Sequence, residues 1–316
     1  MTSDTTSSGP TAGETRPKIR INEVAMRDGL QIEPVFVPTV DKIALVNDLS
    51  RTGVDKIEVT AFVSPKAVPA LADAAQVLGG IDRSNTVRYS ALIPNLRGAR
   101  AAVDARVDEV NFVMSASEPH NLANVNMTHE QSIDLLSQVA QLVKTAGIDL
   151  NATIATAFGC SIEGAVPLSR TMDIAEHYRN LGITSVTLAD TVGMANPRQV
   201  AEMVRVFMEQ FPDTRLTLHF HDTRGLGLAN VLAAVQEGAS SFDTALGGLG
   251  GCPFAPGATG NICTADTVHM LEAMGFDTGV DLPALTPIAA RLAQALERDL
   301  PGRVLKAGPA YAPAQP

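Results

Sequence analysis

The sequence has 316 residues, 45% of them hydrophobic and 18% charged, which is typical of a globular protein with a large core. Acidic residues outnumber basic ones by 34 to 24, and the formal net charge of -10 argues against nucleic acid as the main partner. We find no uninterrupted apolar run of about eighteen residues, so no membrane span and no membrane partner are predicted.

The cysteines and the chain ends suggest an intracellular protein. Cys160, Cys252 and Cys263 are odd in number and widely spaced, which fits a reducing cytoplasm and not a disulfide framework. Residues 1–17 are rich in Ser, Thr and Gly and lack the apolar core of a secretory signal, so we expect a disordered tail. Residues 18–300 are expected to form one domain, followed by a Pro-rich tail at 301–316.

From residue 18 onward, short β-branched runs alternate with amphipathic segments. The predicted strands are 20–24, 56–60, 86–92, 109–114, 149–155, 185–189, 215–220 and 241–245. The main predicted helices are 39–51, 96–105, 128–145, 168–180, 197–210 and 226–237. Helix-ending glycines are expected at Gly53, Gly147, Gly182 and Gly238.

Eight strand-helix units predict an α/β fold, a (β/α)8 TIM barrel. A doubly wound open sheet is the alternative, but no predicted strand is followed by a GxGxxG turn. After the eighth strand, a Gly-rich loop at 247–260 leads into further helices at 261–274 and 283–298. We expect these extra C-terminal helices to pack against the barrel.

Two histidines lie at the end of the seventh predicted strand. His219 and His221 are two residues apart, so in an extended strand their side chains share a face and can hold one ion together. The alternative is a strand that carries two histidines without function. In a chain with only six histidines, the pair favours a metal site.

Other polar residues follow the strands of the predicted barrel, where reactive groups collect. Asp28 could add a carboxylate to the two imidazoles, and Asn261 could add an amide oxygen. Such a mixed set with open positions suits Mg²⁺ or Mn²⁺ better than a closed zinc site. The alternatives are a turn aspartate or helix N-cap for Asp28, and a helix N-cap for Asn261.

Arg27 follows the first predicted strand, and Glu58 lies within the second. Arg27 could hold a positive charge over a developing oxyanion, or form a surface salt bridge. A charge at Glu58 that points into a barrel is costly unless it is paired, so we expect Glu58 to pair with Arg27 or to orient a ligand. Thr187 and Asp190 belong to the same class of strand-end polar residues.

The Gly-rich loop carries Cys252, and a mobile flap with a thiol could give or take a proton over a bound substrate. Cys160 and Cys263 are interpreted as small packing residues.

Four motifs occur together in this chain. They are Arg27-Asp28-Gly29-Leu30-Gln31, Phe62-Val63-Ser64-Pro65-Lys66, His219-Phe220-His221-Asp222-Thr223 and Gly248-Leu249-Gly250-Gly251-Cys252-Pro253. In this combination the chain resembles the 3-hydroxy-3-methylglutaryl-CoA lyases, members of a metal-dependent barrel superfamily that also contains isopropylmalate and homocitrate synthases. The resemblance runs from about residue 21 to residue 296.

The resemblance implies a role for each motif residue. The implied metal ligands are Asp28, His219, His221 and Asn261. The implied catalytic and supporting residues are Arg27 for the enolate, Cys252 as the flap thiol, and His219, Glu58 and Asp190. Arg27, Gln31 and Thr187 are expected to contact the substrate, and Lys66 is a candidate CoA contact unless it is a solvated surface lysine.

The implied reaction is the retro-Claisen cleavage of a 3-hydroxyacyl-CoA. A base removes the hydroxyl proton, the carbon–carbon bond breaks, and a keto acid and the enolate of acetyl-CoA result. With the 3-methylglutaryl substrate the products are acetoacetate and acetyl-CoA, as in leucine degradation and ketone-body formation. A cytoplasmic homodimer or homotetramer is expected, with an acyl-CoA as the small-molecule partner.

Several positions depart from the family pattern. Ala61, Ile32 and the segment 119–122 differ from the methylglutaryl enzymes, so citramalyl-CoA or a longer 3-substituted glutaryl-CoA is an alternative substrate. A condensing synthase on the same site is a rival interpretation, but it calls for Glu where this chain has Leu30. A non-catalytic metal-binding barrel is the other rival, in which Arg27 and Cys252 would be dispensable.

Overall fold

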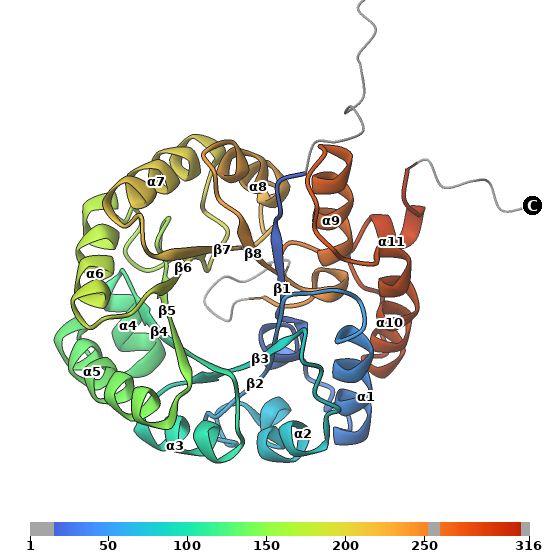
Figure 1. Cartoon of the computed structure of the whole chain (residues 1–316), viewed down its shortest axis with the longest axis horizontal. Coiled ribbons are helices and arrows are strands. Elements are labelled where there is room, and N and C mark those ends of the chain that lie inside the picture. The colour runs from blue at the N-terminus through green and yellow to red at the C-terminus, as the bar shows by residue number, and fades with distance from the viewer. Residues whose placement is uncertain (1–15, 252–259, 311–316) are drawn as a thin grey trace, which may run out of the picture.

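Eight parallel strands form a closed barrel in which each strand pairs with the next along the chain and β8 pairs with β1 (Figure 1). This arrangement comes from a computed structural model that describes residues 16–251 and 260–310. Helices surround the barrel wall, so the predicted TIM barrel is confirmed and the open doubly wound sheet is excluded.

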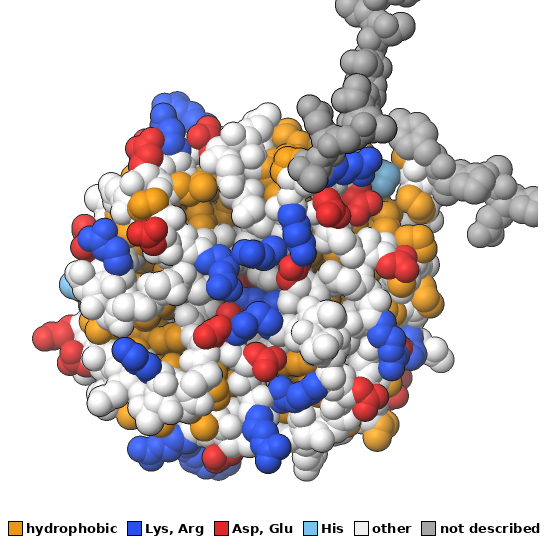
Figure 2. All heavy atoms as spheres, in the orientation of Figure 1, with side chains coloured by type: hydrophobic (Ala, Val, Ile, Leu, Met, Phe, Trp, Pro, Cys, Tyr) orange, Lys and Arg blue, Asp and Glu red, His pale blue; other side chains and the backbone are white. Residues whose placement is uncertain are grey.

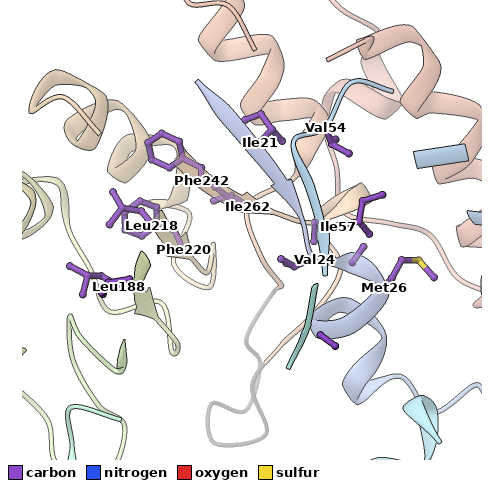
Figure 3. Packing of buried hydrophobic residues seen from close by; sticks show 14 of the residues in the cluster. Ile21, Val24, Met26, Val54, Ile57, Leu188, Leu218, Phe220, Phe242 and Ile262 are labelled. Carbon is purple, nitrogen blue, oxygen red and sulfur yellow. The ribbon is translucent and has the colours of Figure 1, made fainter. Parts of the chain in front are cut away.

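The strands begin and end within two residues of their predicted limits. They are β1 (Arg20–Glu23), β2 (Lys56–Ala61), β3 (Arg88–Ile93), β4 (Glu109–Ser115), β5 (Asp149–Ala155), β6 (Ser185–Asp190), β7 (Arg215–Phe220) and β8 (Ser241–Thr244). Along β7, Leu218 and Phe220 pack with Phe242 of β8 in the apolar layer behind the barrel wall (Figure 3). His219, between them in sequence, therefore faces the barrel interior.

Helices of eight residues or more supply most of the outer layer. They are α1 (Thr39–Leu49), α3 (Leu96–Asp104), α4 (Glu118–Val125), α5 (His129–Ala146), α6 (Leu168–Asn180), α7 (Pro197–Gln210), α8 (Gly227–Gln236), α9 (Thr264–Ala273) and α10 (Leu282–Ala295). The shorter helical segments are η1 (Ala25–Gly29), η2 (Leu30–Ile32), η3 (Pro69–Leu71), α2 (Ala74–Gly80), η4 (Leu246–Gly248) and α11 (Val304–Ala307). The helices α2, α4 and α11 were not predicted, and α11 lies where the sequence predicts only a Pro-rich tail.

Helix ends follow the local sequence. Thr128 caps α5 through a capping box with Gln131, and Gly147 ends the same helix in the left-handed conformation. The other three predicted helix-ending glycines also have positive φ angles: Gly53, Gly182 and Gly238.

The expected helix at 261–274 begins later, at Thr264. Ile262 remains extended because its N–H donates to the Phe220 carbonyl at 3.1 Å and its carbonyl accepts from Ala245 N at 3.0 Å. Asn261 pairs with His221 in an isolated antiparallel bridge. Asn261 is therefore not a helix N-cap, which corrects that alternative.

Both ends of the described chain lie beside α9. Ile19 N donates to the Asp277 carbonyl at 2.9 Å, and the carbonyl of Pro17 accepts from Asp277 N at 3.0 Å. Near the other end, Val304 N donates to Asp266 of α9 at 2.7 Å. No helix among the described residues is long and apolar enough to cross a membrane.

Candidate active site

Asp28 is positioned by a π-helical turn, η1, that starts directly after β1. The carbonyl of Val24 accepts from the backbone N–H groups of Arg27, Asp28 and Gly29 at 3.1, 2.8 and 3.2 Å. The turn directs the Asp28 carboxylate to the carboxyl-terminal mouth of the barrel. Such turns often mark functional sites.

Asp28, His219 and His221 form a group that could hold a metal ion, with one ligand atom from each within 4.8 Å of the others. The Nε2 atoms of the two histidines are 3.1 Å apart, and they lie 3.9 Å (His219) and 3.7 Å (His221) from Asp28 Oδ2. All three side chains are largely buried. The predicted face-sharing of the two histidines is thus confirmed.

Asp243 on β8 supports this group, and the sequence analysis missed it. Its Oδ2 lies 3.3 Å from His219 Nδ1, and its Oδ1 accepts from Asn22 Nδ2 at 2.9 Å. A proton held on Nδ1 by this carboxylate leaves the Nε2 lone pair of His219 free for a cation. Burial by itself would lower the pKa of His219, but the hydrogen bond to Asp243 and the charges of Asp28 and Asp243 raise it.

Asn261 lies against the same carboxylate. Its Nδ2 donates to Asp28 Oδ2 at 2.7 Å and to the Leu249 carbonyl at 3.0 Å. Its Oδ1 is buried without a hydrogen-bond partner among the described residues. A half-turn of the amide would bring that oxygen to the ligand group, so the donor set fits a hard divalent cation.

Gly250 is required for this close approach, because a Cβ there would lie 2.5 Å from Asn261 Nδ2 and its φ angle is 118°.

Arg27 is held between two carboxylates. Its Nε lies 2.5 Å from Glu58 Oε2, and its Nη1 lies 2.5 Å from Asp28 Oδ1. Burial alone would lower the pKa of Arg27, but the charges of Glu58 and Asp28 outweigh it and raise the pKa. Burial would likewise raise the pKa of Asp28, yet Arg27 and the two histidines hold it well below its usual value. The predicted Arg27–Glu58 pair is therefore present, and it is buried.

A ladder of neutral polar side chains continues from Glu58 across the barrel interior. Asn111 Nδ2 donates to Glu58 Oε1 at 2.9 Å, and Asn111 Oδ1 accepts from Asn151 at 3.0 Å and from Thr153 at 2.7 Å. Asn151 also donates to Thr187 Oγ1 at 3.0 Å. The ladder was not predicted, although its asparagines interrupt two apolar strands and could have signalled an inward polar face.

A cavity of about 600 Å³ opens at this mouth of the barrel. Predicted site residues on its lining are Arg27, Asp28, Gln31, Thr187, His219 and His221. Glu58 does not line the cavity but contacts Arg27, which does. Lys66 is exposed and lies outside the lining, although Ser64 and Ala67 of the same loop line the cavity. Cys252 lies outside the described residues, but its neighbour Gly251 lines the cavity.

Asp190 is buried beside the site without lining the cavity. Its carboxylate accepts from Met194 N at 2.7 Å and from Ala195 N at 3.1 Å, so it holds the loop between β6 and α7. Burial raises the pKa of Asp190 against the effect of those hydrogen bonds.

The segment that departs from the expected pattern borders the cavity. His120 of α4 lines it and accepts or donates a hydrogen bond with Ser115 Oγ at 2.7 Å. Ala61 and Ile32, the other departures, do not line the cavity. The two described cysteines, Cys160 and Cys263, are buried in the core, and burial raises the pKa of Cys263 to about 12.

Comparison with known proteins gives one consistent group. The family description HMGL-like matches residues 18–291. The chain is 45% identical to hydroxymethylglutaryl-CoA lyase of Bacillus subtilis over 289 residues, 92% of this chain and 97% of that protein. It is 41% identical to (R)-citramalyl-CoA lyase of Chloroflexus aurantiacus over 303 residues, covering 93% and 96% of the two chains.

Among solved structures, an HMG-CoA lyase of Acinetobacter baumannii in complex with coenzyme A and 3-methylmalate superposes with a TM-score of 0.91. It is 49% identical, with 94% of this chain and 97% of that chain covered.

Proposed function

The chain belongs to the HMGL-like family, and on this premise we propose that it is a carbon–carbon lyase acting on a 3-hydroxyacyl-CoA. The products are acetyl-CoA and a keto acid, which is acetoacetate when the substrate is 3-hydroxy-3-methylglutaryl-CoA. The observation that carries the proposal is the group of Asp28, His219 and His221 beside the buried Arg27, at the mouth of a cavity of about 600 Å³.

A divalent cation, Mg²⁺ or Mn²⁺, is assigned to Asp28, His219 and His221, with the Asn261 oxygen as a fourth protein ligand. When bound, such a cation polarises substrate oxygens as a Lewis acid. The mixed oxygen and nitrogen donors, the two histidine Nε2 atoms that face Asp28 Oδ2, and the Asn261 oxygen, which has no partner among the described residues, support this assignment.

Arg27 is assigned to the enolate. Glu58 and Asp28 keep its guanidinium charged and fix its direction, so little reorganisation is needed when negative charge develops on the thioester oxygen. An oxyanion-hole donor of this kind is worth roughly 3 to 4 kcal/mol in the transition state. Gln31 and Thr187, which line the same cavity, are assigned to substrate contacts.

Proton transfer requires one group to remove the proton of the C3 hydroxyl and one to protonate the enolate carbon. Cys252 follows Gly251 of the cavity wall, so its thiol is proposed for proton transfer, whereas His219, whose Nδ1 faces Asp243 and whose Nε2 is assigned to the cation, is proposed to act as a metal ligand. Lys66 is proposed as a contact for a CoA phosphate, since its loop borders the cavity.

The acyl group is either 3-hydroxy-3-methylglutaryl or a shorter branched hydroxy diacid such as citramalyl. The first is named for the Bacillus relative, and the second for the Chloroflexus relative. The placement of His120 on the cavity wall, within the segment that departs from the methylglutaryl pattern, supports testing both.

The test is acetyl-CoA release from both thioesters with Mg²⁺ or Mn²⁺, with a chelator control. Cys252→Ser is compared with Cys160→Ser, which changes a buried thiol away from the cavity. We expect metal-dependent cleavage, strongly slowed only by the change at Cys252. No cleavage of either thioester, with condensation of acetyl-CoA and a keto acid instead, would establish a synthase; neither activity would favour a non-catalytic metal-binding barrel.

The enzyme is further proposed to act in the cytoplasm as a homo-oligomer, a dimer or tetramer. The buried, unpaired state of the two described cysteines supports a reducing compartment. Light scattering coupled to size exclusion tests the oligomeric state directly.

A further inference from the structure

A second polar cavity lies at the opposite end of the barrel from the metal group. Arg20, Lys56, Arg88 and Arg215 are the first residues of β1, β2, β3 and β7, so they meet at the amino-terminal end of this parallel barrel. All four line a cavity of about 300 Å³, which we call the basal pit. Figure 2 shows Lys and Arg side chains gathered over the centre of this face.

The basal pit carries uncompensated positive charge. Its lining includes two carboxylates, Asp55 and Glu109, and each already has a cationic partner: Lys18 at 3.6 Å and Lys56 at 2.7 Å. Arg88 pairs with Asp149 at 2.5 Å.

By contrast, Arg20 and Arg215 are exposed and form no ion pair with any residue of 16–251 or 260–310. Both guanidinium groups are therefore available to an anion that enters the pit.

The buried floor of the pit offers hydrogen-bond donors without acceptors. Thr217 and Ser241 are both 2% exposed, and their hydroxyl oxygens are 3.0 Å apart. Whichever hydroxyl donates to the other, the remaining O–H has no acceptor within the described part of the chain. Arg88 Nε is likewise buried without a described partner. The unused groups are thus donors and cations, and an acceptor with negative charge would satisfy them.

We propose that the basal pit binds a phosphate-type oxyanion. The guanidinium groups of Arg20 and Arg215 supply the charge, while Arg88 Nε and one hydroxyl of the Thr217–Ser241 pair donate from the floor. The anion bridges the amino-terminal ends of β1, β3, β7 and β8. The site takes either a free phosphate ion or the terminal phosphate of a phosphorylated metabolite, and it does not depend on the proposed lyase activity.

The experiment is a calorimetric titration of the full chain with inorganic phosphate, at an ionic strength held constant with chloride. We expect one saturable site per chain, with an affinity about tenfold or more weaker in the double variant Arg20→Gln/Arg215→Gln, because this variant removes both guanidinium charges assigned to the anion.

The matched control is Arg198→Gln/Arg205→Gln, which removes the same charge from two exposed arginines of α7. Neither of these forms an ion pair with a described residue. This control should bind phosphate like the wild type, and both double variants should retain acyl-CoA cleavage and a cooperative thermal transition.

Methyl phosphate serves as the second probe. Weaker binding than that of phosphate indicates a site for the free ion, and equal or tighter binding indicates the end of a phosphorylated metabolite. The proposal is overturned if wild type shows no saturable binding of either probe, or if both double variants lose binding equally, because the effect is then one of general charge.

Discussion

Asp243 influences the metal group through its hydrogen bond to His219. Its carboxylate holds the Nδ1 proton of His219 and so presents Nε2 toward Asp28 and His221. The same carboxylate is anchored by Asn22, so its direction is fixed from β1. Positioning groups of this kind influence affinity without touching the ion.

We therefore predict that Asp243→Asn weakens Mn²⁺ binding by about tenfold to a hundredfold, as is typical for partners of metal-binding histidines. Asp173→Asn, at an exposed position on α6, is the control and should bind normally. Calorimetric titration of the chelator-treated protein provides the measurement. Equal affinities in the two variants would show that Asp243 does not set the His219 tautomer.

The Arg27–Glu58 pair gives a prediction about stability. Removing one partner leaves a buried charge with less compensation, so Glu58→Leu should lower the free energy of unfolding by about 3 to 5 kcal/mol. Arg27→Met should lose more than Glu58→Leu, because it leaves both Asp28 and Glu58 buried without the guanidinium, whereas Arg27 keeps Asp28 as a partner in Glu58→Leu. Urea unfolding of metal-free protein measures both, and a smaller loss in Arg27→Met would contradict the argument.

At the scale of elements, Glu23 joins three parts of the chain. Its Oε1 accepts from Ala25 N at 2.8 Å and Leu246 N at 2.9 Å, and its Oε2 accepts from Thr264 Oγ1 at 2.7 Å. The carboxylate thus holds η1, η4 and α9 together at the end of β1. Burial raises the pKa of Glu23 to about 7 in spite of these hydrogen bonds.

The raised pKa predicts a pH dependence of stability. Between pH 4.5 and 7 the folded chain holds a proton on Glu23 that the unfolded chain has released, so the contribution of Glu23 is lost as the pH rises. The loss amounts to roughly 3 kcal/mol over this range. Glu23→Gln keeps the acceptor for both N–H groups and can donate to Thr264, so its unfolding free energy should vary less with pH.

Urea unfolding at several pH values between 5 and 8 tests this, with the difference between wild type and variant as the readout. Parallel pH profiles would rule out Glu23 as the titrating group.

Elements were predictable where a repeating pattern is long. The strands β5 and β7 and the helices α6 and α7 have the limits that periodicity predicts. The helices α2 and α4 are short, and the π-helical turn of η1 depends on three N–H groups that share one carbonyl, which periodicity does not encode.

For the site too, some residues could be predicted from the sequence and others could not. His219 and His221 share a face because of strand geometry, so residue spacing predicts their proximity. Asp243 and the ladder of Asn111 and Asn151 depend on which strands become neighbours and in what register, and only the closed barrel supplies that. Asn261 was a candidate ligand from its place after the eighth strand and was also implied by the resemblance, but its extended backbone became visible only in the structure.

At the scale of the whole molecule, a bound cation should link two separate parts of the barrel wall. It would join Asp28, after β1, to His219 and His221 at the end of β7, and so oppose the opening of the wall between them. A ligand that binds only the folded state adds about 2.7 kcal/mol of stability at a concentration one hundred times its dissociation constant.

We therefore expect Mn²⁺ to raise the thermal midpoint of chelator-treated protein. His219→Ala/His221→Ala should abolish the rise, while His177→Gln/His269→Gln, which changes two histidines of α6 and α9, should keep it. Differential scanning calorimetry distinguishes these outcomes, and a rise that persists without His219 and His221 would place the cation elsewhere.

The position of both chain ends beside α9 has a consequence for protein engineering. Residues 17–19 are hydrogen-bonded to Asp277, and residue 304 is hydrogen-bonded to Asp266. A linker between residue 17 and residue 304 would therefore run along α9, and new ends could be opened at Gly147, between α5 and β5, where a Cβ would meet no atom within 4 Å. Such a circular permutant would begin with β5 and still contain every strand-helix unit of the barrel intact.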